Sequence, residues 1–167
     1  MPPHPRISGQ SFHRAYSMDA NIVIKTGLTG FIMLDRIVEV SACRIVGAKS
    51  FNGLPAYLRL ESLAQLGALH IRCLTGFSRH VFLIKIVSCS IPLRTSPEGE
   101  YILSGDMVSR SDSSFRCLLK AGRDKETAAE ADLLYAAVDY DHNFKKGILQ
   151  DHYTRVFSCL RRDSRTG

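Results

Sequence analysis

The chain has 167 residues, of which 45% are apolar, 23% charged and 8% aromatic, and this is the composition of one globular domain with a core of its own. It argues against a disordered chain, a collagen and a small disulfide-rich scaffold. The formal net charge of +6 permits an acidic partner, such as nucleic acid, a membrane surface or an acidic protein, but it selects none of them.

No apolar run in the sequence is long enough to span a membrane, and the first residues lack the apolar segment of a secretory signal. We therefore expect a cytoplasmic protein without a membrane span. The five cysteines stand singly and form no C-x-x-C, and His142 and His152 have no histidine or cysteine at metal-ligand spacing beside them. Neither a disulfide framework nor a metal site is expected.

Residues 1–20 show no hydrophobic period, which predicts a flexible N-terminal arm ahead of one domain over 21–140. Within that domain, runs of apolar and β-branched residues predict six strands, over residues 31–40, 44–51, 81–91, 101–108, 115–121 and 133–140. The run from Val81 to Val87 is so continuously apolar that we expect this strand to be covered on both faces. After the last strand, helical spacing over 143–160 predicts a C-terminal helix, within a segment 141–167 that ends in a basic tail.

Between the second and third strands, the sequence from Pro55 to about Thr75 predicts one long helix. Its residues are apolar nearly all round, so we expect the helix to be buried. At about 100° per residue, Glu61, Gln65 and Arg72 fall in one short polar row, whereas His70 lies on the opposite side.

The elements follow the order of two strands, a helix and four strands. This order predicts an α+β protein in which an antiparallel sheet wraps one long buried helix, the arrangement called the hotdog fold, with an extra C-terminal helix. Proteins of this fold commonly dimerise side by side.

Glu61 is the main candidate for chemistry because it is a carboxylate on a helix of leucines and alanines. Such a group must be paired, protonated or held near water in a pocket, since burying a bare charge is costly. A carboxylate of this kind suits general acid or base work, and Gln65, one turn later, could orient it. The competing interpretation is structural, with Glu61 facing solvent or paired with Arg59 or Arg72.

The start of the helix offers a second part of a site. The backbone N–H groups of Ala56 and Tyr57 have no partner within the helix and could polarise the carbonyl oxygen of a thioester. The histidines fit less well, because His70 lies across the helix from Glu61 and we expect His80 to sit in a loop. The sequence has no phosphate-binding loop, dinucleotide fingerprint or nucleophile elbow, which argues against nucleotide chemistry.

Two stretches, Leu34–Val40 and Leu54–Gln65, resemble the 3-hydroxyacyl-acyl carrier protein dehydratase family, especially its divergent members from aryl-polyene-type gene clusters. The first stretch is similar to the family motif L-V-D-R-V-x-E, and the second to P-G-V-L-x-x-E-A-L-A-Q. The resemblance covers about residues 28–140 and implies that Glu61 is the catalytic carboxylate and Gln65 the motif's glutamine.

The resemblance also implies substrate contacts and partners. Ala56 stands where the family has a glycine whose N–H faces the thioester carbonyl, and the surrounding residues expected to contact substrate are Phe31, Gly53, Leu54 and Tyr57. The implied substrate is an acyl chain on the phosphopantetheine of acyl carrier protein or coenzyme A, with no further cofactor. The implied assembly is a homodimer, or a heterodimer with another hotdog subunit.

The chain departs from the family just before the helix. The family has F-x-G-H-F-P there, with a histidine as the base, whereas Phe51-Asn52-Gly53 runs directly into Leu54-Pro55. A carboxylate alone lacks the partner that divides proton removal from hydroxyl protonation. A histidine from elsewhere, such as His13 or His80 of either subunit, could refill the vacant position.

Three functions therefore remain open. The chain could be a dehydratase-like protein that binds acyl thioesters or supports an active partner subunit. It could be a thioesterase in which Glu61 attacks the thioester or activates water, or a scaffold in which Glu61 is structural. A nucleic-acid-binding module is a rival of another class, but no stretch interleaves basic with aromatic residues, so we expect no nucleic-acid partner.

Overall fold

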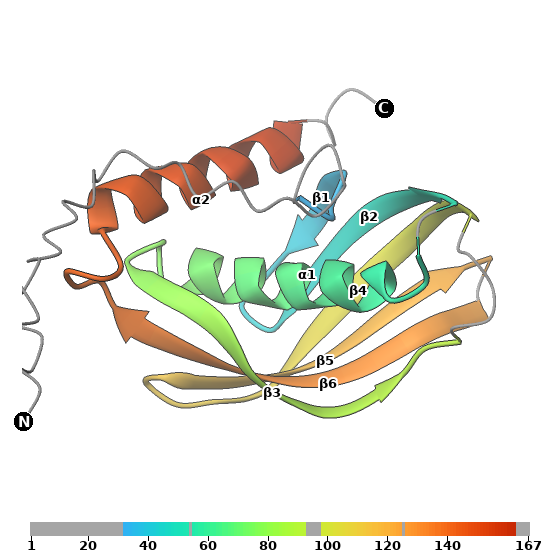
Figure 1. The fold of residues 1–167 in the computed structure, drawn as a ribbon, viewed down its shortest axis with the longest axis horizontal. Coiled ribbons are helices and arrows are strands. Elements are labelled where there is room, and N and C mark those ends of the chain that lie inside the picture. The colour runs from blue at the N-terminus through green and yellow to red at the C-terminus, as the bar shows by residue number, and fades with distance from the viewer. Residues whose placement is uncertain (1–31, 54, 93–97, 125, 163–167) are drawn as a thin grey trace, which may run out of the picture. The chain divides into compact units, whose positions relative to one another are not determined.

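Figure 1 shows the computed structural model, which describes residues 32–53, 55–92, 98–124 and 126–162. These residues form a six-stranded sheet and two helices. In chain order the elements are β1 (Arg36–Val40), β2 (Arg44–Asn52), α1 (Leu58–Leu74), β3 (Arg79–Ser90), β4 (Glu98–Arg110), β5 (Ser114–Arg123), β6 (Glu126–Asp139) and α2 (Lys146–Arg162). The arm expected over 1–20 lies outside the described residues, as do His13, Phe31 and Leu54.

The sheet has the strand order β1-β2-β4-β5-β6-β3, and every neighbouring pair is antiparallel. Alternate residues of β5 show which face is covered, because Phe115, Cys117 and Leu119 are buried whereas Arg116 and Lys120 are exposed. In Figure 1 the sheet curves around α1, so its buried face holds the helix. This is the hotdog arrangement predicted from the order of the elements, and the fold is α+β.

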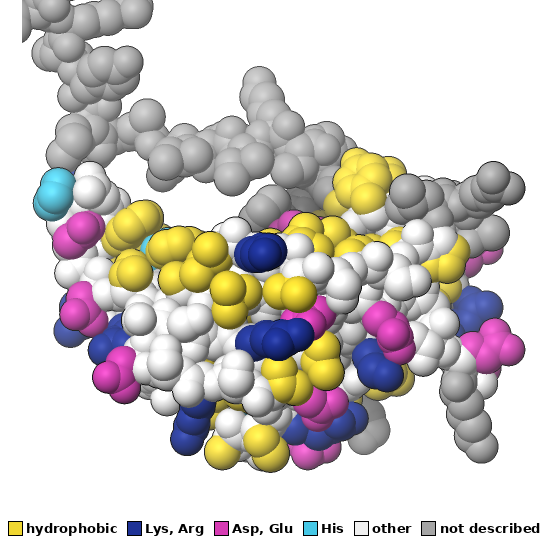
Figure 2. Space-filling view, turned by 90° about the horizontal axis from the view of Figure 1, so that it is seen from below, with side chains coloured by type: hydrophobic (Ala, Val, Ile, Leu, Met, Phe, Trp, Pro, Cys, Tyr) yellow, Lys and Arg dark blue, Asp and Glu magenta, His cyan; other side chains and the backbone are white. Residues whose placement is uncertain are grey.

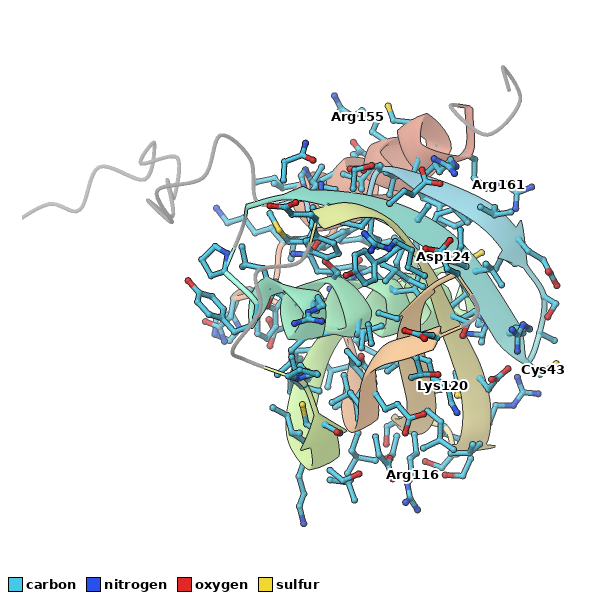
Figure 3. All side chains as sticks on the ribbon, turned by 90° about the vertical axis from the view of Figure 1, so that its right-hand side faces the viewer. Cys43, Arg116, Lys120, Asp124, Arg155 and Arg161 are labelled. Atoms are coloured by element: carbon cyan, nitrogen blue, oxygen red, sulfur yellow. The ribbon has the colours of Figure 1, made fainter. Side chains whose placement is uncertain are left out.

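The outer face of the sheet, seen in Figure 2, mixes apolar and charged side chains. Ile102 of β4 is 47% exposed. Arg116 and Lys120 of β5, labelled in Figure 3, pair across to Asp132 and Glu130 of β6 at 2.5 and 3.0 Å. Ion pairs this close to water contribute little, so the stability of the sheet comes chiefly from the face that covers α1.

The helix α1 begins after Pro55 and ends where the backbone turns left-handed. No side chain caps its start, and the N–H of Leu58 bonds to the Pro55 carbonyl at 3.0 Å. At its end Gly76 has φ +58°, a conformation that glycine adopts at low cost. The N–H of Phe77 then bonds to the Arg72 carbonyl at 2.7 Å, which satisfies one of the last carbonyls of the helix.

α1 approaches β6 closely at Gly67. A Cβ at this position would collide with the hydroxyl of Tyr135 and would lie 2.9 Å from its Cζ atom. The hydroxyl donates to the Ala64 carbonyl at 3.0 Å, and the Tyr135 ring is fully buried beneath the helix. Glycine is therefore required here for space, because the tyrosine occupies the volume that a side chain would need.

The predicted strand over 81–91 is present as β3, but its environment differs from the prediction. β3 pairs with β6 alone and so forms an edge of the sheet. Val81 is buried, whereas residues 82–90 are exposed, with Ile84 at 53%. The prediction that this run is covered on both faces is wrong for the single chain, because the side chains of residues 82–90 are exposed and nothing in the described residues covers them.

The first strand is shorter than predicted and starts at Arg36. The residues just before it run towards α1, where Met33 donates its backbone N–H to the side chain of Gln65. Met33 and Leu34 are both buried, at 4% and 5% exposure. This segment therefore links the start of β1 to the polar row of α1.

The predicted C-terminal helix is present as α2 and contacts β1, β3 and α1. Leu160 is buried, and the ring of Phe157 lies 5.5 Å from that of Phe77, just beyond the end of α1. Phe77 has φ +57°, which is strained for a bulky residue. Its ring contact and the hydrogen bond from the Tyr140 hydroxyl to its carbonyl, at 3.2 Å, hold it in that conformation.

Candidate functional site

Glu61 and Gln65 come together as the sequence predicts. Glu61 lies in the first turn of α1 and Gln65 lies one turn later, and both side chains are half-buried. The Gln65 amide nitrogen Nε2 donates to Glu61 Oε1 at 2.8 Å. The carboxylate is thus held by a neutral donor and still reaches solvent, as a group that must exchange protons requires.

Gln65 is itself fixed from the other side. Its Oε1 accepts the backbone N–H of Met33 at 2.8 Å, across 32 residues of sequence. A backbone N–H is an obligate donor, so it holds the carbonyl end of the amide and turns the NH₂ end towards Glu61. The segment before β1 therefore takes part in the site, which the sequence pattern alone did not indicate.

The start of α1 lies one turn from Glu61. Ala56 is buried at 7% exposure, whereas Tyr57 is 62% exposed. Within the described part of the chain, no group accepts a hydrogen bond from the backbone N–H of either residue. These N–H groups and the positive end of the helix dipole suit an oxygen that gains negative charge.

Arg59 fixes the start of the helix against the sheet. It is 2% exposed, and its guanidinium donates to the carbonyls of Ala56, Pro92 and Ala128 at 3.3, 2.6 and 3.3 Å. Pro92 follows β3 and Ala128 lies in β6, so one side chain joins three segments. The Ala56 turn is thereby held in place next to Glu61.

The remaining residues predicted to contact substrate are only partly described. Gly53 follows β2, is exposed and has φ +66°, a left-handed conformation that favours glycine. Phe31 and Leu54 lie outside the described residues, so their predicted contacts stay predictions.

The described histidines do not join Glu61. His70 is 1% exposed on α1, and its Nε2 lies 2.8 Å from the Ser41 carbonyl, while its Nδ1 is buried without a partner. Burial lowers the pKa of His70. The prediction that His80 lies in a loop is wrong. His80 is the second residue of β3, and its ring stacks on that of Phe144, with the ring centres 4.3 Å apart.

Arg72 was predicted in the polar row of Glu61 but is directed elsewhere. Its guanidinium donates to the Val81 carbonyl at 2.5 Å and lies 3.8 Å from the centre of the Tyr153 ring. The side chain is 6% exposed, and its Nε has no hydrogen-bond partner in the structure. Burial lowers the pKa of Arg72. Arg72 therefore belongs to the contact between α1 and α2.

Other chemistry finds little support in the residues that the structure describes. Among them, no three His, Cys, Asp or Glu side chains gather as metal ligands would. Burial raises the pKa of the Cys117 thiol to about 12, so this cysteine is inert at neutral pH. No helix in the described ranges is long and apolar enough to cross a membrane.

The structure is similar to those of known proteins, although the sequence is not. No protein-family model and no curated protein matches the sequence. A mutant of thioesterase PA1618 from Pseudomonas aeruginosa has a similar structure, with a TM-score of 0.55 and 10% identity over 62% of this chain and 81% of that one. Thioesterase HI1161 from Haemophilus influenzae is also similar in structure, with a TM-score of 0.54 and 9% identity over 64% of this chain and 80% of that one.

The dehydratase heterocomplex ApeI:P from Xenorhabdus doucetiae is also similar, with a TM-score of 0.55 and 11% identity over 68% of this chain and 86% of that one. These likenesses establish that the chain has the hotdog fold. At such low identities they assign no role to any residue, because one fold hosts many activities.

Proposed function

We propose that this protein binds acyl thioesters at the start of α1 and that Glu61 is its catalytic carboxylate. The observation that carries the proposal is the Gln65 hydrogen bond at 2.8 Å, which orients a half-buried carboxylate one turn from the Ala56 and Tyr57 N–H groups. An oriented carboxylate beside free backbone donors suits a carbonyl substrate that gains charge on its oxygen. The similar thioesterases and dehydratase complex support the same class of substrate.

Hydrolysis is the reaction that the chain's own residues support. In this step Glu61 takes a proton from a water molecule whose oxygen attacks the carbonyl carbon, and the carbonyl oxygen is held by the Ala56 and Tyr57 N–H groups. The C–S bond then breaks, and the departing thiolate receives the proton from Glu61. No histidine is needed, which agrees with the position of His70 across the helix.

Dehydration is the second candidate, and it requires a second group beside Glu61, since none of the described histidines of this chain bonds to it. Removal of the α-proton and protonation of the leaving hydroxyl need two groups, of which Glu61 is one. The similarity to a dehydratase heterocomplex favours this alternative. We propose that a hotdog partner, or a second copy of this chain, would supply the missing base.

The exposed edge of β3 supports pairing with such a subunit. Phe82, Leu83, Ile84, Ile86 and Val87 are each at least 37% exposed on this edge strand. A long apolar edge strand is a template for pairing with another strand. We propose that side-by-side dimerisation covers it, as in other hotdog proteins.

A turnover assay followed by mass spectrometry tests the proposal. Saturated and 3-hydroxyacyl thioesters, on carrier protein and on coenzyme A, would be offered to the wild type, to Glu61→Gln and to Glu39→Gln. Glu39 is an exposed carboxylate of β1 and serves as the matched control. We expect release of free acid by the wild type and by Glu39→Gln, and a loss of about 100-fold or more in Glu61→Gln.

Each other outcome has a meaning of its own. If the wild type removes water from the substrate and Glu61→Gln does not, the protein is a dehydratase. If the acyl thioester on carrier protein stays bound and chemically unchanged, it is a binding protein. Equal turnover by the wild type and Glu61→Gln would remove Glu61 from catalysis and leave it a structural role.

A further inference from the structure

Asp35 holds the segment that leads into β1. Its Oδ1 lies 2.7 Å from the Lys49 ammonium and its Oδ2 accepts the backbone N–H of Ser50 at 2.6 Å. Its own N–H donates to the Ala48 carbonyl at 2.9 Å. Burial alone would raise the pKa of Asp35, but the hydrogen bonds from Lys49 and Ser50 hold it below its usual value. The carboxylate thus ties residue 35 to β2 at Lys49 and Ser50, and the backbone N–H adds a third bond at Ala48.

Two residues earlier, the same segment reaches the site. The Met33 N–H donates to Gln65 Oε1 at 2.8 Å, and Gln65 Nε2 donates to Glu61 Oε1 at 2.8 Å. The two ends of an amide differ, since one accepts and the other donates. If the Met33 N–H moved away, Gln65 could rotate its amide and present an oxygen to the Glu61 carboxylate, which would repel it.

We propose that Asp35 is a positioning residue for Glu61, acting through the Met33 N–H and the Gln65 amide. The hydrogen bonds run in one direction, from the backbone donor at Met33 to the carboxylate at the end. Because each member donates to the next, the chain of bonds presents Glu61 as an acceptor, the form needed to take a proton from water. This inference rests on the proposed role of Glu61, and it adds a residue on the far side of the segment to that site.

The matched control is Glu100. Glu100 forms an exposed ion pair with Arg36, the residue next to Asp35, but has no bond to Met33 or Gln65. Glu100→Gln therefore removes a carboxylate on β4, opposite Ser50 of β2, without touching the chain of bonds. Asp35→Ala removes all acceptors of the Asp35 side chain, and Asp35→Asn retains one oxygen for Ser50.

The first readout is nuclear magnetic resonance of the full-length protein, because it does not depend on activity. In Asp35→Ala we expect hydrogen exchange of the Met33 amide to rise at least about fivefold and the Gln65 side-chain NH₂ signals to shift. Asp35→Asn should lie between Asp35→Ala and the wild type, and Glu100→Gln should change neither signal. If Asp35→Ala does not fold, Asp35→Asn and Lys49→Met carry the same test.

The second readout is a double-mutant cycle on kcat with the thioester that the wild type turns over. We expect Asp35→Asn to lower kcat about fivefold with KM unchanged, and to have no further effect in a Gln65→Met background, since its action passes through Gln65. Additive effects of the two changes would overturn the proposal, as would Met33 and Gln65 signals identical to the wild type in the folded Asp35 variants. If no thioester is turned over, the proposed function fails while the resonance measurement still decides the role of Asp35.

Discussion

Four polar side chains of α1 form two groups, one near each end of the helix, and the groups differ in their hydrogen-bond partners. Glu61 and Gln65 bond to each other near its start, whereas His70 bonds to the Ser41 carbonyl and Arg72 to the Val81 carbonyl. The first pair is half-buried and reaches solvent, and the second pair is fully buried. Chemistry is therefore expected near the start of α1, and the other two groups serve the packing of its far half.

The buried state of His70 predicts a pH dependence of stability. Its folded pKa is lowered by burial, and protonation would place a proton on Nδ1, which has no partner. The unfolded chain then binds more protons, so stability is complete above the unfolded pKa near 6.5 and falls as pH drops below it. We expect the free energy of unfolding, measured with urea between pH 7 and 5, to fall by up to about 1.4 kcal/mol per pH unit from this residue.

The variant His70→Gln keeps a donor for the Ser41 carbonyl but cannot titrate in this range. It should reduce the slope of stability against pH below 6.5. His152→Gln, on the exposed face of α2, is the control and should leave the slope unchanged. Parallel curves for the wild type and His70→Gln would show that His70 is not the group responsible.

At the scale of single residues, the sequence predicted the site only where periodicity applies. Glu61 and Gln65 are one turn apart, so their contact follows from helical geometry. Met33 and Asp35 lie outside any helix or strand. Met33 reaches Gln65 through a bond across 32 residues that no local pattern encodes, and the role proposed for Asp35 depends on the same bond. The positions of Phe31 and Leu54 beside the site stay predictions.

At the scale of elements, α2 makes aromatic contacts with α1 and with the turn that follows it. Tyr153 lies over the Arg72 guanidinium and Phe157 lies against Phe77. His80 and Phe144 stack next to them, ahead of the helix. The periodicity of 143–160 predicted the helix, but the partners on α1 and β3 come from distant parts of the sequence, so the way it packs could not be derived.

Removing one of these rings should loosen α2 while the sheet stays folded. Phe157→Ala deletes a half-buried ring, and we expect the amides of α2 to lose about 2 kcal/mol of protection against hydrogen exchange. The buried strands β5 and β6 should exchange as in the wild type. Ser158→Ala, on the exposed side of the same helix, should have no effect. Equal loss of protection in α2 and the sheet would mean that α2 is part of the global folding unit.

At the same scale, the apolar composition of β3 predicts that the strand is buried, but it does not indicate which surface covers it. Its apolar run is typical of a strand covered on both faces, yet β3 is an edge strand with Ile84 and Ile86 at 53% and 44% exposure. A sequence reports that a surface is apolar, and it does not distinguish the chain's own core from a second subunit. By contrast, β5 alternates between buried and exposed residues, because it has a strand of this chain on either side and one face against α1.

For the whole molecule, this edge predicts the assembly. We expect the wild type to sediment with twice the 18.6 kDa mass of one chain, because pairing of two β3 strands would bury the exposed apolar residues and satisfy the free backbone groups of the edge. Ile84→Lys, which adds a charge to the edge, should produce monomers in analytical ultracentrifugation.

The outer face of the sheet supplies the control for that experiment. Ile102 is exposed to a similar degree, at 47%, but lies on β4 in the middle of the sheet, so Ile102→Lys should leave the dimer intact. Dissociation by Ile102→Lys with a stable Ile84→Lys dimer would move the interface to the outer face, and a monomeric wild type would show that β3 does not pair with a second copy. In that last case the apolar edge would call for a different hotdog subunit, and mixing with such a subunit should protect the β3 amides from hydrogen exchange.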